Sequence, residues 1–164
     1  MNVLDAIRAK RAVRRFTDQP LSDDAVRAIL DAGRRSQSSK NSQPCTFIAI
    51  RDRETLKKLS ECGKYAGHLA GAAFALALVA PSGDHDFDLG QAAAYMQLAA
   101  WDLGIGSCIA SMWEPVKAKT ILDIPKELHF DTAISFGYPA ESASGAPKKG
   151  GRRSLEEVVR WERW

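Results

Sequence analysis

The segment DFDLGQAAAYMQLAAWDLG, residues 86–104, decides the fold class of this chain. Its apolar residues recur at helical spacing, and further apolar residues fill the other faces of the same helix. A helix that is apolar nearly all round is buried on all sides. In a domain of only 164 residues, one of those sides is expected to meet a second subunit. The segment therefore predicts a long central helix at a subunit interface.

Shorter helices and strands are predicted on both sides of this central helix. Ser22 is expected to cap one of the helices and Gly33 to end it. The strand at 72–81 is apolar on both faces and is therefore expected to lie centrally in a covered sheet. The predicted helices span 3–10, 21–36, 53–62 and 116–123, and the predicted strands span 46–52, 72–81, 105–111 and 132–139. Because helices and strands mix without strict alternation, the chain is predicted to form an α+β, three-layer α-β-α sandwich.

Composition indicates an ordinary globular protein with one domain over residues 1–164. Hydrophobic residues make up 45% and charged residues 26% of the chain, and the formal net charge is +3. The most apolar segment, AGAAFALALVA at 70–80, is too short to span a bilayer. The N-terminus has no signal-peptide pattern, and Cys45, Cys62 and Cys108 have neither metal nor disulfide spacing. A cytoplasmic protein that binds neither membrane nor nucleic acid is expected.

Conventional catalytic motifs are missing from the sequence. The three histidines lie in unrelated contexts, and DHDFD at 84–88 is interpreted as a solvated turn before a helix rather than a metal site. The chain has no G-x-S-x-G elbow and no phosphate-binding P-loop. The glycines of LGIGSC at 103–108 are interpreted as a tight helix end. We therefore assign no catalytic side chain and no metal ligand, and expect a cofactor to supply any redox chemistry.

Three polar segments remain as candidates for a binding site. They are KRAVRRF at 10–16, SQSSKNSQPC at 36–45 and PKKGGRR at 147–153. Each alone is typical of a solvated loop. Together they suit a phosphorylated planar ligand, because arginine clusters bind phosphate through charge-assisted hydrogen bonds. Hydroxyl and amide side chains match the ribityl hydroxyls and the pyrimidine edge of a flavin.

The same segments resemble motifs of the nitroreductase family of FMN-dependent oxidoreductases. KRAVRRF resembles the family's R-R-S-x-R-x-F motif, and SQSSKNSQP resembles its A-P-S-x-x-N-x-Q-P motif. LAAWDLGIGSC is similar to the family's L-x-A-x-x-L-G-L-G segment, and FGYPA and RRSLEEVVRWERW resemble its closing segments. The matches run in family order from Ala9 to Trp164. The chain departs from these motifs at Ala12, Gln37 and Cys45, where the family often has serine, proline and tryptophan.

The resemblance implies where FMN would bind. The phosphate and the ribityl chain would lie on the first motif, at Lys10, Arg11, Ala12 and Arg14. The flavin would be contacted from the other subunit by Ser38, Ser39, Asn41 and Gln43. Flavin N5 would be approached by the loop that contains Ser111 and Met112. Arg152, or else Lys149 or Arg153, would return from the C-terminus to the phosphate.

The resemblance also implies an architecture and a reaction. The central sheet would be mostly antiparallel, and two chains would form an interlocked homodimer with exchanged C-terminal arms. NAD(P)H would pass hydride through flavin N5 to an acceptor such as a nitroaromatic or a quinone. Dehalogenation, flavin fragmentation and non-enzymatic flavin storage remain alternatives. A nucleic-acid-binding module is disfavoured, because no recognition helix or RNA-binding motif accompanies the basic segments.

Overall fold

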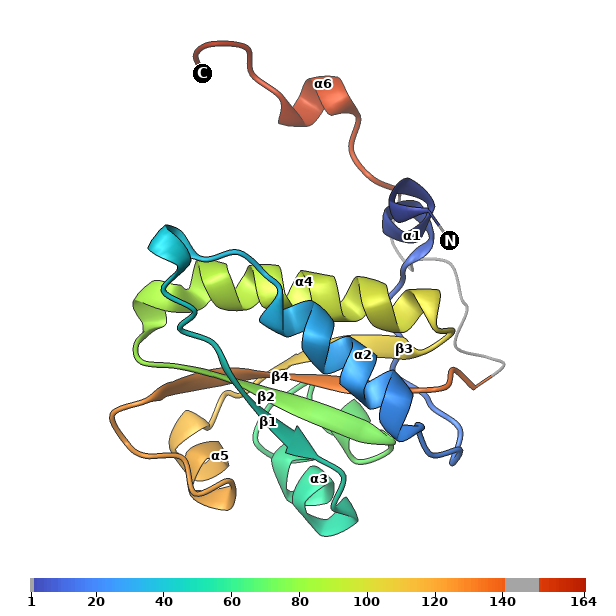
Figure 1. Ribbon diagram of the computed structural model, residues 1–164, viewed down its shortest axis with the longest axis vertical. Coiled ribbons are helices and arrows are strands. Elements are labelled where there is room, and N and C mark those ends of the chain that lie inside the picture. The colour runs from blue at the N-terminus through green and yellow to red at the C-terminus, as the bar shows by residue number, and fades with distance from the viewer. Residues whose placement is uncertain (1, 141–150) are drawn as a thin grey trace.

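The computed structural model describes residues 2–140 and 151–164. Within them the strands form one antiparallel sheet in the order β1-β2-β4-β3. The strands are β1 (Thr46–Ile50), β2 (Phe74–Ala80), β3 (Gly106–Ser111) and β4 (His129–Gly137). β3 lies at one edge of the sheet, with β4 on its inner side (Figure 1).

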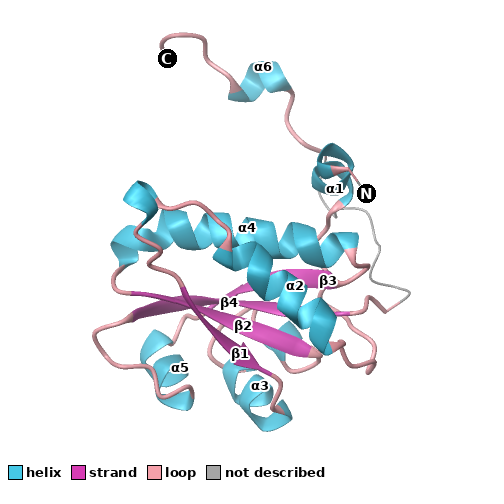
Figure 2. Ribbon diagram, in the orientation of Figure 1, coloured by secondary structure: helices cyan, strands magenta, loops and turns pink. Residues whose placement is uncertain are grey.

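Helices cover both faces of the sheet (Figure 2). α2 (Asp23–Arg34) and α4 (Asp86–Asp102) pack on one face, with Ile29, Phe74 and Met96 in the core between them and the sheet. α3 (Arg53–Ser60) and α5 (Pro115–Ile121) cover the other face around a second core that includes Leu56 and Phe130. The predicted three-layer sandwich is therefore confirmed.

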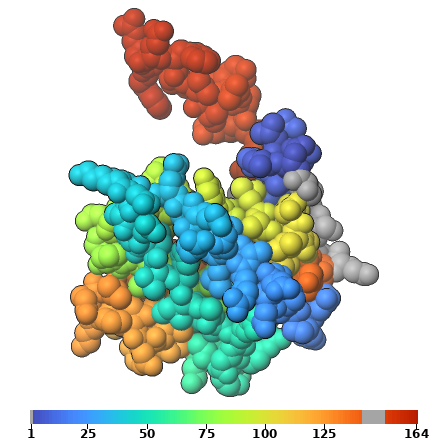
Figure 3. Space-filling model, in the orientation of Figure 1, coloured from blue at the N-terminus to red at the C-terminus, as the bar shows by residue number. Residues whose placement is uncertain are grey.

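The remaining helices are short. α1 (Val3–Ala9) precedes the body, and α6 (Leu155–Val158) follows it. Single 3-10 turns occur at η1 (Ser39–Asn41), η2 (Gly67–Leu69) and η3 (Gly83–His85). The chain after residue 150 projects from the body beside α1 (Figure 3). Across the described ranges, no helix combines the length and the hydrophobicity that a membrane span requires.

β2 confirms the prediction of a central strand, since it is buried along its whole length and pairs with β1 and β4. β4, by contrast, begins at His129, three residues before the predicted start at 132. The reason is tertiary: Phe130 is buried in the second core, and His129 pairs with Ala80 of β2. The periodicity around 129 gave no sign of this pairing.

The prediction that Gly33 ends its helix is wrong. Ser22 caps α2 as expected, its side chain accepting from the Ala25 N–H, but the helix continues through Gly33 to Arg34. Gly33 is buried, and a side-chain carbon built there would collide with Met96 of α4. This glycine therefore allows α2 and α4 to approach each other closely.

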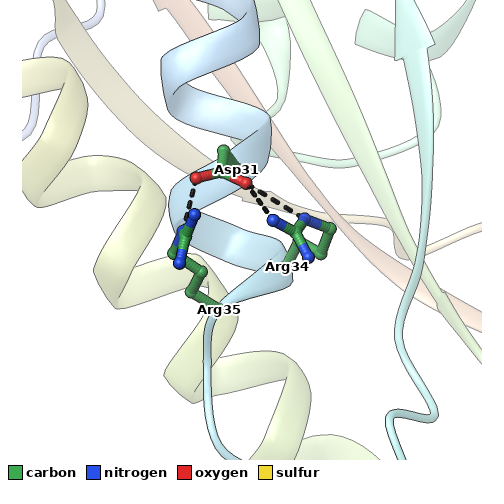
Figure 4. A network of polar contacts seen from close by, with 3 residues as sticks. All are labelled: Asp31, Arg34 and Arg35. Atoms are coloured by element: carbon green, nitrogen blue, oxygen red, sulfur yellow. Dashed lines mark hydrogen bonds and ion pairs between the residues drawn. The ribbon is translucent and has the colours of Figure 1, made fainter.

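A polar network closes the last turn of α2. Asp31 accepts hydrogen bonds from the guanidinium groups of Arg34 and Arg35 (Figure 4). The bond from Arg35 and then the bond from Arg34 hold the pKa of Asp31 below its usual value. Both arginines are largely exposed, so the network orders the surface more than it stabilises the fold.

α4 is not buried on all sides within the single chain, and the prediction that a second subunit covers its remaining side stays a prediction. Leu89, Met96 and Ala100 face the core, whereas Phe87 and Tyr95 are 79% and 43% exposed. Exposed apolar side chains also occur on α1 and on the C-terminal segment: Val3, Leu4, Ile7, Leu155, Val158, Trp161 and Trp164. Apolar surface on this scale is typical of a protein interaction site.

Candidate cofactor site

The basic segment after α1 is fixed to the edge strand β3. Ala12 forms a parallel bridge with Ser107, and the Val13 N–H donates to the Ser107 carbonyl at 3.0 Å. Val13 is buried against Gly106, where a side-chain carbon would lie 2.6 Å from Val13 Cβ. A glycine at position 106 is therefore required for the segment to lie against the strand. We call residues 10–14 the cation loop.

The charges of Lys10 and Arg14, two residues of this loop, both act on Cys108 of β3. Lys10 is half-buried, and its pKa is lowered mainly by that burial, with an opposing effect from Cys108. Burial raises the pKa of the Cys108 thiol, while the charges of Arg14 and Lys10 oppose the rise. The expected inert, buried thiol thus lies within electrostatic reach of both cations.

Arg11 has a different role within the single chain. Its Nη1 donates to the carbonyl oxygens of Arg8 and Lys10, at 2.6 and 3.0 Å. It therefore binds backbone carbonyls at the C-terminal end of α1, where a positive charge is favourable. The prediction that Arg11 contacts a phosphate remains a prediction.

A buried polar cluster that the sequence did not reveal lies beside the cation loop. His68 Nδ1 lies 2.8 Å from Ser135 Oγ, and Ser135 Oγ lies 3.3 Å from the Cys108 carbonyl oxygen, to which it donates. His68 is 8% exposed and Ser135 is fully buried. Burial, and then the charge of Arg14, lower the pKa of His68. A backbone hydrogen bond with Ile109 acts in the opposite direction and raises this pKa, and Nε2 of the ring is buried.

The 36–45 segment forms a strained loop between α2 and β1. Lys40, Asn41 and Gln43 have φ angles of 52°, 55° and 50°, a region that residues other than glycine rarely occupy. The Gln43 N–H donates to Ser38 Oγ at 2.9 Å, which closes the turn. Ser39, Asn41 and Gln43 are exposed, and Ser38 is partly buried. Such strain is common at ligand-binding sites.

This loop and the cation loop lie at opposite ends of α4 (Figure 1). Gln37 Nε2 donates to Gln91 Oε1 at 3.0 Å, near the start of α4. The cation loop bridges Ser107, beyond the end of α4 at Asp102. From Gln91 to Asp102 the helix axis rises by about 17 Å. The two predicted halves of the site are therefore separated within one chain.

Ser111 and Met112 lie at the end of β3 opposite the bridge to the cation loop. Ser111 is exposed, Met112 is buried, and the Met112 N–H donates to the Asp131 carbonyl at 2.7 Å. The next residue, Trp113, is 60% exposed and meets Tyr65 edge to face, with ring centroids 6.0 Å apart. An exposed aromatic pair thus adjoins the loop predicted to face flavin N5.

Of the three predicted C-terminal cations, the structure describes Arg152 and Arg153. Arg152 and Arg153 are exposed at the start of the segment that leads to α6, while Lys149 lies outside the described residues. Ser154 caps α6 in a reciprocal arrangement with Glu157. The contact of either arginine with a phosphate remains a prediction.

The DHDFD segment forms η3 and the first turn of α4, as the interpretation of a turn before a helix requires. Asp86 nevertheless meets two residues of β4. His129 Nε2 lies 3.0 Å from Asp86 Oδ1 and 3.6 Å from Asp131 Oδ2. Asp86, His129 and Asp131 therefore form a polar cluster between the start of α4 and β4.

One cavity adjoins the strained loop, and a second lies beside the middle of β3. One of about 550 Å³ lies between α2 and the strained loop, with Ser38 and Gln43 in its wall. The other, of about 370 Å³, lies between α4 and the strands β3 and β4, with Gln97 and Ile109 in its wall. The cation loop lines neither of these two cavities.

Known proteins resemble this chain over nearly its whole length. The model of the nitroreductase family matches residues 7–64 and 64–138. An Archaeoglobus fulgidus protein with the provisional name NADH dehydrogenase/NAD(P)H nitroreductase is 33% identical over 84% of this chain and 86% of its own length. The FMN reductase [NAD(P)H] of Bacillus subtilis is 26% identical over 89% of this chain and 69% of its own length.

Solved structures agree with the fold. A provisionally named nitroreductase of Desulfovibrio desulfuricans, solved in complex with FMN, has a TM-score of 0.83 and 33% identity, covering 100% of this chain and 99% of its own. An FMN-dependent nitroreductase of Clostridium difficile has a TM-score of 0.85 and 25% identity, covering 99% and 100%. The chain belongs to the nitroreductase family.

Proposed function

We propose that the protein is an FMN-dependent NAD(P)H oxidoreductase that acts as a homodimer. When bound, the flavin accepts hydride from the reduced nicotinamide and delivers it to an electron acceptor such as a nitroaromatic or a quinone. The names of the relatives support the use of NAD(P)H and FMN. The acceptor and the dimer are proposals of our own.

The observation that carries the proposal is the separation of the two half-sites along α4. Lys10 and Arg14 suit a phosphate at one end, and the strained polar loop suits the ring system at the other. A second chain that packs antiparallel on the exposed face of α4 would place its own polar loop beside the first chain's cations. The exposed Phe87 and Tyr95 on α4 would then be covered.

The residues present fit an FMN molecule. Cations converge on β3, as a phosphate requires, because the charges of Lys10 and Arg14 both act on Cys108 of this strand. β3 leads from the bridge at Ser107 to Ser111 over about 13 Å. A ribityl phosphate with part of a ring system can span such a distance.

The role of the protein in the reaction would be to bind and orient. Lys10 and Arg14 would hold the phosphate, and the partner's polar loop would hydrogen-bond to the ring. The loop at Ser111 would leave one ring face open to the nicotinamide and then to the acceptor. We assign no side chain as an acid or a base in hydride transfer, because the cofactor itself supplies that chemistry.

The test is anaerobic reduction of the purified, FMN-loaded protein. We expect yellow protein with absorbance bands at roughly 370 and 450 nm, which belong to oxidised flavin, and bleaching within seconds on addition of NADH or NADPH. A panel of nitroaromatics and quinones would then restore the colour. Protein that binds flavin but is bleached by neither nicotinamide would be a storage protein instead. Failure to bind FMN would overturn the proposal.

A further inference from the structure

An exposed aromatic pair lies beside the loop that the proposed function places at flavin N5. Tyr65 and Trp113 are 71% and 60% exposed, and their rings meet edge to face at 6.0 Å. Apolar side chains that gather on a surface are typical of a binding site. The dimer contact proposed on α4 does not account for this pair. Its loops lie before η2 and before α5, and α5 covers the face of the sheet opposite α4 (Figure 1).

The two loops that carry these rings are fixed to each other. The N–H groups of Trp113 and Glu114 both donate to the Cys62 carbonyl oxygen, at 2.8 and 3.0 Å. Cys62 is fully buried and lies three positions before Tyr65. The backbone therefore holds both rings in place before any ligand binds, which lowers the entropic cost of binding.

A glycine brings these loops against the end of β3. A side-chain carbon built at Gly63 would collide with the Ser111 carbonyl oxygen, so the close approach requires glycine. Trp113 follows Ser111 by two positions, and two residues of chain span at most about 7 Å. Because flavin N5 is expected at Ser111, a planar acceptor bound beside N5 can reach the aromatic pair.

Lys64 adds a positive charge to the pair. Its Nζ lies 5.6 Å from the ring centroid of Tyr65 and 5.6 Å from that of Trp113, within the range of a cation–π interaction. Lys64 is exposed, and it forms no ion pair with a carboxylate of residues 2–140 or 151–164. The ammonium group is therefore held at the rings, and its N–H donors can bind an anionic ligand.

The chemistry of this surface indicates what it binds. The faces of tyrosine and tryptophan rings carry partial negative charge, so they stack favourably on a ring that is poor in electrons. The ammonium group of Lys64 attracts a carboxylate. Nitroaromatics and quinones, the acceptor classes of the proposed function, are planar rings poor in electrons.

We propose that Lys64, Tyr65 and Trp113 form the binding surface for the electron acceptor, and that they select nitroaromatics and quinones that carry a carboxylate. This inference rests on the proposed function, because it requires the flavin ring at Ser111. The three residues bind and position the acceptor, and they take no part in the transfer of hydride.

Binding of para-nitrobenzoate and of nitrobenzene to the oxidised, FMN-loaded protein tests the selection by charge. Oxidised flavin has no hydride to give, so the change in its absorbance reports binding without turnover. We expect the native protein to bind para-nitrobenzoate more tightly, and Lys64→Gln to lose about two- to fivefold in affinity for this compound alone. Lys57→Gln, which removes an exposed lysine of α3, is the matched control and should keep both native affinities.

Substitutions of Trp113 test the aromatic contact. Trp113→Leu should weaken the binding of both compounds by about two- to tenfold, the contribution of one aromatic pair. Trp113→Phe keeps a ring and should lose less. The Trp113→Leu protein, once reduced by NADH, should need a higher acceptor concentration for half-maximal reoxidation. Its reoxidation rate at saturation and its affinity for FMN should remain native.

The outcomes separate the two proposals. If the native protein fails to bind FMN, or if neither NADH nor NADPH reduces it, the proposed function is wrong and this inference falls with it. If the native protein is reduced and reoxidised, but Lys64→Gln and Trp113→Leu bind both nitro compounds as tightly as the native protein, this inference alone is overturned. A higher half-saturating concentration of NADH, with none for the acceptor, would assign the surface to the dinucleotide and also overturn it.

Discussion

Ala12 pairs with Ser107 as a parallel bridge, which ties the cation loop to the free edge of β3. The attachment is reinforced by Val13, which is buried against Gly106. This attachment fixes the backbone of the cation loop. The charges of Lys10 and Arg14 therefore both act on Cys108 of β3. The first predictions concern this loop.

Arg14→Ala should lose most of its FMN while remaining folded. Removing one charge-assisted phosphate contact costs about 1.5–3 kcal/mol, or roughly ten- to a hundredfold in affinity. Fluorescence titration of the flavin measures the affinity, and circular dichroism checks the fold. Arg51→Ala is the matched control: this exposed arginine pairs with Asp23 at 2.8 Å and should leave the affinity unchanged. Equal affinity in both variants would show that Arg14 does not hold the phosphate.

Gly106→Ala should weaken FMN binding through Val13. The added carbon would meet the Val13 side chain at 2.6–2.8 Å, and valine has little rotameric freedom with which to yield. Overpacking of this kind costs about 1–3 kcal/mol, and here it would displace the cation loop. Adding Val13→Gly to the variant, which removes Cβ as well as both methyl groups, should restore part of the affinity. A double variant that binds FMN less tightly than Gly106→Ala alone would contradict this account.

Asn41→Gly should lower the affinity for FMN with little change in thermal stability. Asn41 has a φ of 55°, which glycine adopts without strain, so the substitution removes the amide and keeps the backbone. Asn41→Ala would add strain and confuse the two effects. Parallel melting curves and FMN titrations check the prediction. A lower melting temperature with unchanged FMN affinity would mean that Asn41 only shapes the loop.

Acid should destabilise the flavin-free protein through His68. Its folded pKa is lowered from the usual 6.5, so below about pH 6.5 the unfolded chain binds a proton that the folded chain resists. The contribution of His68 to stability is therefore complete above that pH and declines as the pH falls toward the folded pKa. Chemical unfolding of the native protein and of His68→Gln at pH 7.5 and 5.5 measures the effect. The native protein should lose more stability than the variant, and equal losses would contradict the assignment.

Removing the chain from Leu155 onward should weaken both dimer and FMN binding. Trp161 and Trp164 are 83% and 101% exposed in the single chain, and covering them is the expected gain of exchanging arms. Binding that is linked to assembly weakens with it. Analytical ultracentrifugation at several concentrations, with and without FMN, tests this. A full-length variant with Trp161→Ser and Trp164→Ser separates the apolar contacts from chain length. Unchanged dimer and FMN binding in both variants would contradict an exchanged arm.

Local patterns predicted most of the fold. Alternating and helical periodicity located the strands and helices, and the apolar composition of residues 74–80 identified β2 as an interior strand. Gly33 misled the prediction, because a helix-ending glycine and a glycine at a helix crossing look alike until the second helix is in place. The start of β4 was missed for a similar reason, since its first residues pair with β2 across the sheet.

The candidate site was harder to predict for physical reasons. The cation loop could be identified from its dense run of charged residues. His68 and Ser135, by contrast, are single polar residues in apolar surroundings, 67 positions apart in the sequence. A histidine near a strand gives no local sign of a distant hydroxyl. The available sequence signal for this cluster was Ser135, a polar residue within the otherwise apolar centre of β4. The positive φ angles of Lys40, Asn41 and Gln43 are likewise a property of the folded backbone, which the residue types alone do not determine.

The central claim is that each FMN site is built from two chains. It is tested most directly by co-expressing Arg14→Ala and Asn41→Gly chains with different affinity tags and purifying the mixed dimer. If the cation loop of one chain meets the polar loop of the other, one of the two sites combines both defects and the other is intact. The account predicts that the mixed dimer binds about half as much FMN tightly as the native dimer, and more than either parent variant. A mixed dimer that holds no more FMN than its parents would contradict it.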